Sequence, residues 1–176
     1  MPFTPFHFGP GTALKAAWPR GLSLTSFVLT QVAVDVEPLV HYLRHERPLH
    51  GFFHTIVGAT LVGVVVGIAW FWLARPAARW TFARARAREE ALELVRAEVS
   101  LGGTLLGGIL GGSTHSLLDG LVHPDVHPFS PFSEANPFYR AIPWSGVILG
   151  CVVAGGIGLA VLARDVRSRR VRTPRP

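Results

Sequence analysis

The chain has 176 residues, of which 49% are hydrophobic and only 16% are charged, and its formal net charge at pH 7 is +6. A single domain is expected at this length, and a soluble domain usually carries about a quarter charged residues. The basic residues are nearly all arginines that flank long uncharged blocks, so we expect a membrane protein and no nucleic-acid partner.

The apolar segments predict a helical bundle in the membrane. Residues 8–18 favour a short helix that ends at Pro19 and is too short to span alone. Four longer segments are long enough to cross the hydrocarbon core: Leu22–Val40, Gly51–Ala74, Leu101–Val122 and Pro143–Ala163. The predicted fold class is therefore all-α, a polytopic membrane bundle of four spans plus a short N-terminal helix, within one domain over residues 1–163.

Glycines recur at four-residue spacing in two of these segments. Gly103, Gly107 and Gly111 lie in the third span, and Gly63 and Gly67 lie in the second. Small residues at this spacing let helix backbones approach closely in lipid. The pattern therefore predicts tight helix packing.

The arginine-rich segments orient the chain. Residues 75–100 predict a polar helix at the membrane surface, and residues 164–176 predict a disordered arginine-rich tail. The positive-inside rule places both in the cytoplasm. We therefore expect a multi-pass protein of the inner (plasma) membrane with a cytoplasmic C-terminus, and loops 41–50 and 123–142 at the outer face.

Histidines and carboxylates of three spans converge on that outer face. They are Asp35 and Glu37, His50 and His54, His115 and Asp119, and then His123 and Asp125 in the following loop. The two residues of the His115–Asp119 pair are four apart, so they project from one helix face and can hold one ion together. Imidazole and carboxylate are ligands that zinc or manganese prefers.

Ionisable groups inside spans are costly unless they are paired or coordinated. The alternative to a metal site is a set of hydrogen bonds between helices, such as His115 with Asp35. A haem held by paired histidines is conceivable, but it would leave the carboxylates unexplained.

Four short motifs resemble a known family: MPFTPFHFGPG, VDVEP, PLHGFFHT and STHSLLDGLVHPD. Their order and spacing resemble those of the YdjM-type metal-dependent hydrolases, inner-membrane proteins also described as LexA-binding, from Met1 to about Phe138. That family is in turn distantly similar to the zinc-dependent phospholipase C and P1-type nuclease group. The resemblance implies that the metal ligands are His7, Asp35, His54, His115 and Asp119.

One departure from the phospholipase pattern limits the expected metal content. That group has a further His-x-x-x-Glu pair late in the chain, and nothing after His127 supplies it here. One or two divalent ions, rather than three, are therefore expected.

The expected function is metal-dependent hydrolysis of a phosphoester or a membrane lipid, with Glu37 or Asp125 as the general base. One alternative is a non-catalytic scaffold or assembly protein with a structural metal or a hydrogen-bonded polar cluster. Another is a small metal or proton carrier, against which the apolar, glycine-rich inner half of the third span argues.

Overall fold

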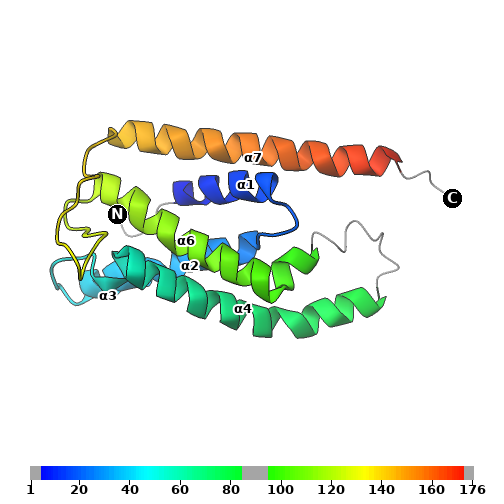
Figure 1. Cartoon of the computed structure of the whole chain (residues 1–176), viewed down its shortest axis with the longest axis horizontal. Coiled ribbons are helices and arrows are strands. Elements are labelled where there is room, and N and C mark those ends of the chain that lie inside the picture. The colour runs from blue at the N-terminus through cyan, green and yellow to red at the C-terminus, as the bar shows by residue number, and fades with distance from the viewer. Residues whose placement is uncertain (1–4, 85–94, 173–176) are drawn as a thin grey trace.

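The computed structural model describes residues 5–84 and 95–172, and this part of the chain is helical without any strand (Figure 1). The elements are η1 (Pro5–His7), α1 (Phe8–Ala17), α2 (Leu24–Val34), α3 (Val36–Leu43), η2 (Phe52–His54), α4 (Ile56–Arg84), α6 (Leu101–Val122) and α7 (Trp144–Arg172). The all-α prediction is confirmed, and α1 is the predicted short N-terminal helix.

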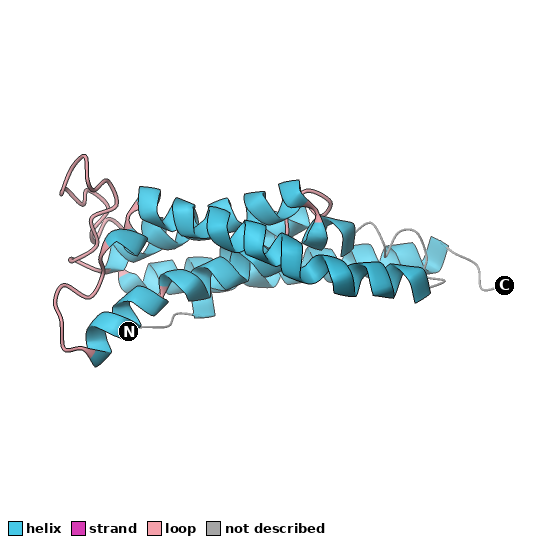
Figure 2. Ribbon diagram, turned by 90° about the horizontal axis from the view of Figure 1, so that it is seen from below, coloured by secondary structure: helices cyan, strands magenta, loops and turns pink. Residues whose placement is uncertain are grey.

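The helices lie along one long axis, and the loops around α3 and between α6 and α7 gather at one end of the bundle (Figures 1 and 2). Helix α6 packs against both α2 and α4, whereas α1 pairs mainly with α7. The central helix α6 therefore brings its C-terminal residues next to the ends of α2 and η2.

Two of the predicted spans meet the requirements for crossing a membrane. They are Ile56–Pro76 of α4, with mean hydropathy 2.2, and Trp144–Asp165 of α7, with mean hydropathy 2.4. In the most apolar stretch of each helix, only 22% (α4) and 17% (α7) is buried inside the protein. The core helix of a soluble protein would be mostly buried. Leu73 and Leu149 are among the large apolar side chains that they expose.

The prediction of four spans is not supported. Helix α2 has 11 residues and is about 16 Å long, roughly half the hydrocarbon thickness of a bilayer. Helix α6 has the predicted bounds, but glycines, His115 and Asp119 lower its hydropathy, and it buries all of these except Gly102 inside the bundle. Length and absence of charge alone did not distinguish such an interior helix from a lipid-facing one.

The predicted first span is broken at Asp35. Helix α2 ends at Val34 and α3 starts at Val36, with Pro38 in its first turn. A proline ring clashes with the carbonyl group four residues earlier, which here belongs to Val34. The break places the Asp35 side chain at the end of α2, level with the end of α6.

Glycines allow α6 to approach its neighbours at backbone distance, as their spacing predicts. A Cβ atom at Gly63 would collide with the carbonyl oxygen of Gly108, and one at Gly108 would collide with that of Gly63. One turn along α6, a Cβ atom at Gly112 would collide with the carbonyl oxygen of Ala59. This contact holds α4 against α6 just before His115.

The start of each arginine-rich segment continues the apolar helix before it. Helix α4 continues to Arg84, so the start of the predicted surface helix belongs to α4; residues 85–94 lie outside the described part of the chain. Helix α7 continues to Arg172, so the predicted tail is helical over residues 164–172. Arginine is a good helix former, which favours continuation of α7 beyond its apolar part.

Candidate metal centre

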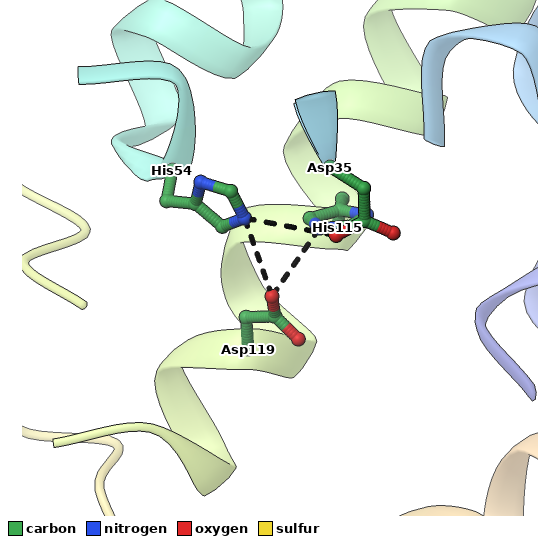
Figure 3. A group of neighbouring side chains, drawn as sticks. All are labelled: Asp35, His54, His115 and Asp119. Atoms are coloured by element: carbon green, nitrogen blue, oxygen red, sulfur yellow. Dashed lines mark ion pairs between the residues drawn. The ribbon is translucent and has the colours of Figure 1, made fainter. Parts of the chain in front are cut away.

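Asp35, His54, His115 and Asp119 form a group that could hold a metal ion (Figure 3). They come from the α2–α3 break, the end of η2 and two successive turns of α6. One ligand atom from each lies within 4.8 Å of one ligand atom from every other. The structure therefore brings together four of the five predicted metal ligands.

The distances between these atoms suit a tetrahedral ion. His115 Nε2 lies 3.2 Å from Asp119 Oδ2 and 3.4 Å from Asp35 Oδ1. His54 Nε2 lies 3.4 Å from Asp119 Oδ2 and 4.0 Å from Asp35 Oδ1. Ligands about 2.0–2.1 Å from a tetrahedral zinc ion lie roughly 3.3–3.4 Å from one another. Three of these four histidine–carboxylate separations are close to this spacing, and the fourth, between His54 and Asp35, is longer.

In His54 and His115, the ring nitrogen that faces away from the group, Nδ1, is held by a hydrogen-bond acceptor. His115 Nδ1 lies 2.6 Å from Gln31 Oε1, and His54 Nδ1 lies 3.1 Å from Glu37 Oε2. An amide or carboxylate oxygen can only accept, so each Nδ1 donates its hydrogen. The neutral tautomer of both rings therefore has its Nε2 lone pair directed at the centre, as in histidines that bind metals.

The Nε2 atoms of His54 and His115 make no hydrogen bond in the described part of the chain. Both are buried without a hydrogen-bond partner, since their contacts with Asp35 and Asp119 lack hydrogen-bond geometry. The side chains of His54 and His115 are at most 1% exposed. A buried acceptor nitrogen facing carboxylates is unfavourable unless a proton or a metal cation lies between them. Because these contacts lack hydrogen-bond geometry, the arrangement fits a metal ion better than hydrogen bonds between helices.

The fifth predicted ligand, His7, lies beside the group on another side of Asp119. Its Nε2 is 3.6 Å from Asp119 Oδ1, whereas His54 and His115 face Oδ2 of the same carboxylate. Its Nδ1 is also buried without a hydrogen-bond partner among the described residues. His7 precedes α1, which runs from this end of the bundle toward Lys15, as its predicted place in the site requires.

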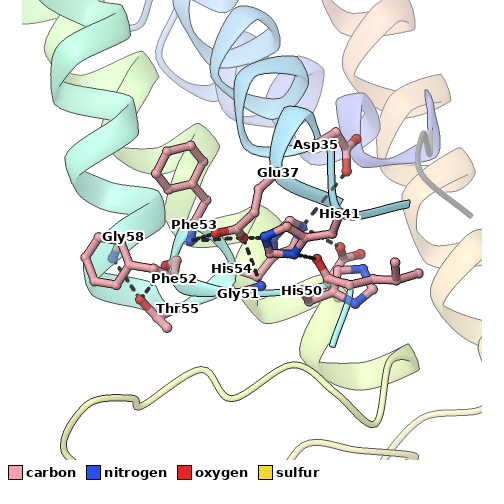
Figure 4. A network of polar contacts seen from close by, with 12 residues as sticks. Asp35, Glu37, His41, His50, Gly51, Phe52, Phe53, His54, Thr55 and Gly58 are labelled. Carbon is pink, nitrogen blue, oxygen red and sulfur yellow. Dashed lines mark hydrogen bonds and ion pairs between the residues drawn. The ribbon is translucent and has the colours of Figure 1, made fainter. Parts of the chain in front are cut away.

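Glu37 contacts the outer side of the centre and fixes the segment before α4 (Figure 4). Its carboxylate accepts hydrogen bonds from the backbone N–H groups of Gly51 (2.9 Å) and Phe53 (3.0 Å) as well as from His54. Ser116 Oγ donates a 2.6 Å hydrogen bond to the carbonyl oxygen of His54. These contacts fix both the backbone and the ring of His54.

A second group of ligating side chains, His50, His123 and Asp125, lies next to the first. His50 Nδ1 is 3.0 Å from Asp125 Oδ1, and the rings of His50 and His54 are 4.6 Å apart. Burial lowers the pKa of His50 and of His123, so both are neutral at pH 7. Burial raises the pKa of Asp125, but His50 and a backbone N–H group outweigh this effect and lower it.

Sequence reasoning missed Gln31 and the grouping of His50 with His123. Gln31 could have been found, because it precedes Asp35 by one helical turn and is polar within an apolar stretch. The remaining histidines described here make loop contacts: His41 with the carbonyl groups of Pro48 and Leu49, and His127 with Glu134. His45 lies just after α3, the helix that carries His41.

Comparison with known proteins places the whole bundle in one family. A domain of unknown function, DUF4184, matches residues 1–173. No curated protein and no solved structure matches the chain significantly. The resemblance to YdjM-type hydrolases therefore has no named homologue to support it. Since the match covers nearly every residue, including both groups of ligating side chains, the chain belongs to the DUF4184 family.

Proposed function

We propose that the protein is a metal-dependent hydrolase that acts on a phosphoester or a lipid at the outer face of a membrane. The observation that carries this proposal is the pair of buried imidazoles whose Nδ1 atoms are held by Glu37 and Gln31 while their Nε2 atoms face two carboxylates. Their nitrogen and oxygen ligand set suits zinc, with manganese as the alternative.

The four side chains of Figure 3 would hold the ion, with His7 beside them. A bound divalent cation supplies a Lewis acid that lowers the pKa of water and polarises a phosphoryl oxygen. In the described part of the chain, the ionic partners of Asp35 and Asp119 are histidines. Burial lowers the pKa of His54 and of His115, but the neighbouring carboxylates outweigh this effect and raise both, that of His115 to about 9, so the site attracts positive charge.

Of the two carboxylates predicted as general base, Glu37 is better suited to positioning His54. Its oxygens are already engaged by His54 and two backbone N–H groups. A carboxylate that orients a metal-ligating histidine in this way raises the basicity of that ligand. Asp125 keeps 30% of its side chain exposed and lies on the solvent side of the cluster.

The proposed location is the inner (plasma) membrane, with α4 and α7 in lipid and the C-terminus in the cytoplasm. The apolar outer surfaces of these two helices support a membrane location. Arginines near the ends of α4 and α7 lie at the opposite end of the bundle from His54, and the positive-inside rule assigns such an end to the cytoplasm. The metal centre would then face outward, at the depth of lipid headgroups.

A second candidate is a scaffold in which the metal only fixes the helices. The burial of His54, His115 and Asp119 favours it, because a structural metal site usually has four protein ligands and no open position. A hydrolase instead needs a coordination position that water and substrate can reach. Catalysis is therefore the property that separates the two candidates.

The test uses the full-length protein purified in detergent, with metal analysis and assays on phosphodiester and phospholipid substrates. We expect bound zinc or manganese, and hydrolysis that is lost on chelation and restored by the metal. Asp119→Ala should lose both metal and hydrolysis, whereas His127→Ala, a histidine outside the cluster, should keep both. Metal retained by the wild type without hydrolysis of any substrate class would favour the scaffold.

A further inference from the structure

The group of His50, His123 and Asp125 is not explained by the first centre. His50 precedes η2, His123 caps the end of α6, and Asp125 lies in the loop that follows. One ligand atom from each lies within 4.8 Å of the others, and the rings of His50 and His123 are 4.4 Å apart. The two loops therefore bring three potential ligands to one point.

The carboxylate of Asp125 is held in a fixed orientation. Its Oδ2 accepts hydrogen bonds from the backbone N–H groups of Leu49 (3.2 Å) and His50 (3.3 Å). Its Oδ1 is left facing His50 Nδ1 at 3.0 Å. The backbone of one loop thus sets the direction of a carboxylate from the other loop.

The nitrogen that faces this carboxylate has no hydrogen-bond partner in the described residues. His50 is 7% exposed, and its Nδ1 is buried without hydrogen-bond geometry toward Asp125 despite the short separation. If the contact served only to tie the two loops together, the N–H group should point at the oxygen. Two polar atoms that approach without sharing a hydrogen are instead arranged like two ligands of one ion.

We infer that His50, His123 and Asp125 bind a second divalent cation beside the first. The inference deepens the proposed function and rests on the first centre being a metal site. It makes Asp125 a metal ligand, in place of its predicted role as general base. The 4.6 Å separation of the His50 and His54 rings makes the two centres neighbours.

The second site differs from the first in ligand number and in exposure. It has three protein ligands, the number found in catalytic zinc sites, which keep a fourth position for water or substrate. The side chain of Asp125 is 30% exposed, compared with 5% for Asp119. The second site is thus the one that an anionic oxygen of a phosphoester can reach from solvent.

The test is a titration of Zn²⁺ into chelator-stripped full-length protein in detergent, followed by metal analysis. We expect about two equivalents for the wild type and about one for Asp125→Asn and for the His123→Ala/Asp125→Asn pair. Asparagine keeps the size of aspartate and can still accept from Leu49 and His50, so the loops should remain in place. Circular dichroism should confirm unchanged helix content in each variant.

The matched control is His127→Ala, which removes a histidine of the same loop whose Nδ1 contacts the carbonyl oxygen of Glu134, and it should keep about two equivalents. One equivalent in the wild type, or an unchanged content in the double variant, would overturn the second site. Loss of both ions from a normally helical double variant would also contradict it, because the first ligand set is intact. Two ions without hydrolysis would refute only the proposed function, and hydrolysis with one ion would refute only the second site.

Discussion

The bundle contains a buried polar cluster near each end, and the two are built differently. At the end away from the loops, Lys15 Nζ lies 2.7 Å from Glu98 Oε1 and donates to the carbonyl oxygen of Leu22. The Glu98 carboxylate also accepts from the backbone N–H groups of Leu24 and Thr25 at the start of α2. The Lys15–Glu98 cluster therefore balances its charges and caps a helix.

The candidate metal centre at the other end has carboxylates but no lysine or arginine partner among the described residues. Buried ring nitrogens of His54 and His115 lack a hydrogen-bond partner there, as do those of His7 and His50 beside it. The difference shows how to separate a structural polar cluster from a ligand site. In the first cluster the protein pairs its own polar atoms, and in the second it leaves buried ring nitrogens without hydrogen-bond partners.

The largest expected effect is that of Asp119→Ala at the metal centre. This change removes the carboxylate shared by three histidines, so metal affinity should fall by more than about 10²-fold, and activity should fall with it. Metal analysis and a hydrolysis assay on the purified variant measure both losses. A metal content equal to that of the wild type would mean that Asp119 is not a ligand.

The next effect is that of Glu98→Gln, which should destabilise the protein with or without metal. Removing one partner of a buried ion pair costs about 3–5 kcal/mol, and partial exposure of Glu98 places this change near about 3 kcal/mol. Chemical unfolding in detergent measures it. Lys15→Met combined with Glu98→Gln should recover part of the loss, and metal content should stay normal in both variants.

The same cluster should make stability depend on pH in the acid range. Burial raises the pKa of Glu98, but Lys15 and the N–H groups of α2 outweigh burial and lower it below 4.5. The stabilisation is therefore fully present above pH 4.5 and is lost as the pH falls toward the pKa of the folded protein. The stability difference between wild type and Glu98→Gln should shrink only in that acid range, and a constant difference there would contradict the lowered pKa.

A smaller effect is expected for the residues that orient the histidines. Glu37→Leu and Gln31→Leu should each lower metal affinity by about 10–100-fold, because each removes an acceptor that fixes an imidazole. Competition with a chelator of known affinity measures this. If Glu37→Gln keeps its metal affinity and instead loses turnover by about 10²–10⁴-fold, Glu37 is the general base that the sequence predicted.

The smallest effect concerns the helix contact that supports the centre. Gly108→Ala should cost about 1–3 kcal/mol and weaken metal binding, because the new methyl group separates α4 from α6. Gly102→Ala is the matched control on the same helix, since a Cβ atom there meets nothing within 4 Å. It should be neutral or stabilise by up to about 1 kcal/mol. Equal effects of the two changes would rule out the glycine contact as a support of the site.

Much of the centre could be predicted, because the position of a residue along a helix sets the level of its side chain along the bundle. The spacing of His115 and Asp119, and the positions of Asp35 and His54 near the ends of apolar segments, placed all four at one level. The role of Glu37 could not be predicted in the same way, because it depends on the turn of the chain at Asp35. The partnership of Gln31 with His115 depends on the packing of α2 against α6, which periodicity does not specify.

The number of spans was the least predictable feature. Helix α6 has the length of a span, and only its packing shows that ten of its residues are buried within the protein. The Lys15–Glu98 cluster was also unforeseen, because its partners come from distant parts of the chain.

The position of His7 has a consequence for how the protein is made. The ligands of the centre come from the start of α1, the end of α2, η2 and the end of α6, so the ion's surroundings are complete only after α6 has been synthesised and packed. If the centre binds a metal as proposed, metal capture would be a late step of folding, and retention of the ion would report that α6 has packed against α2 and α4.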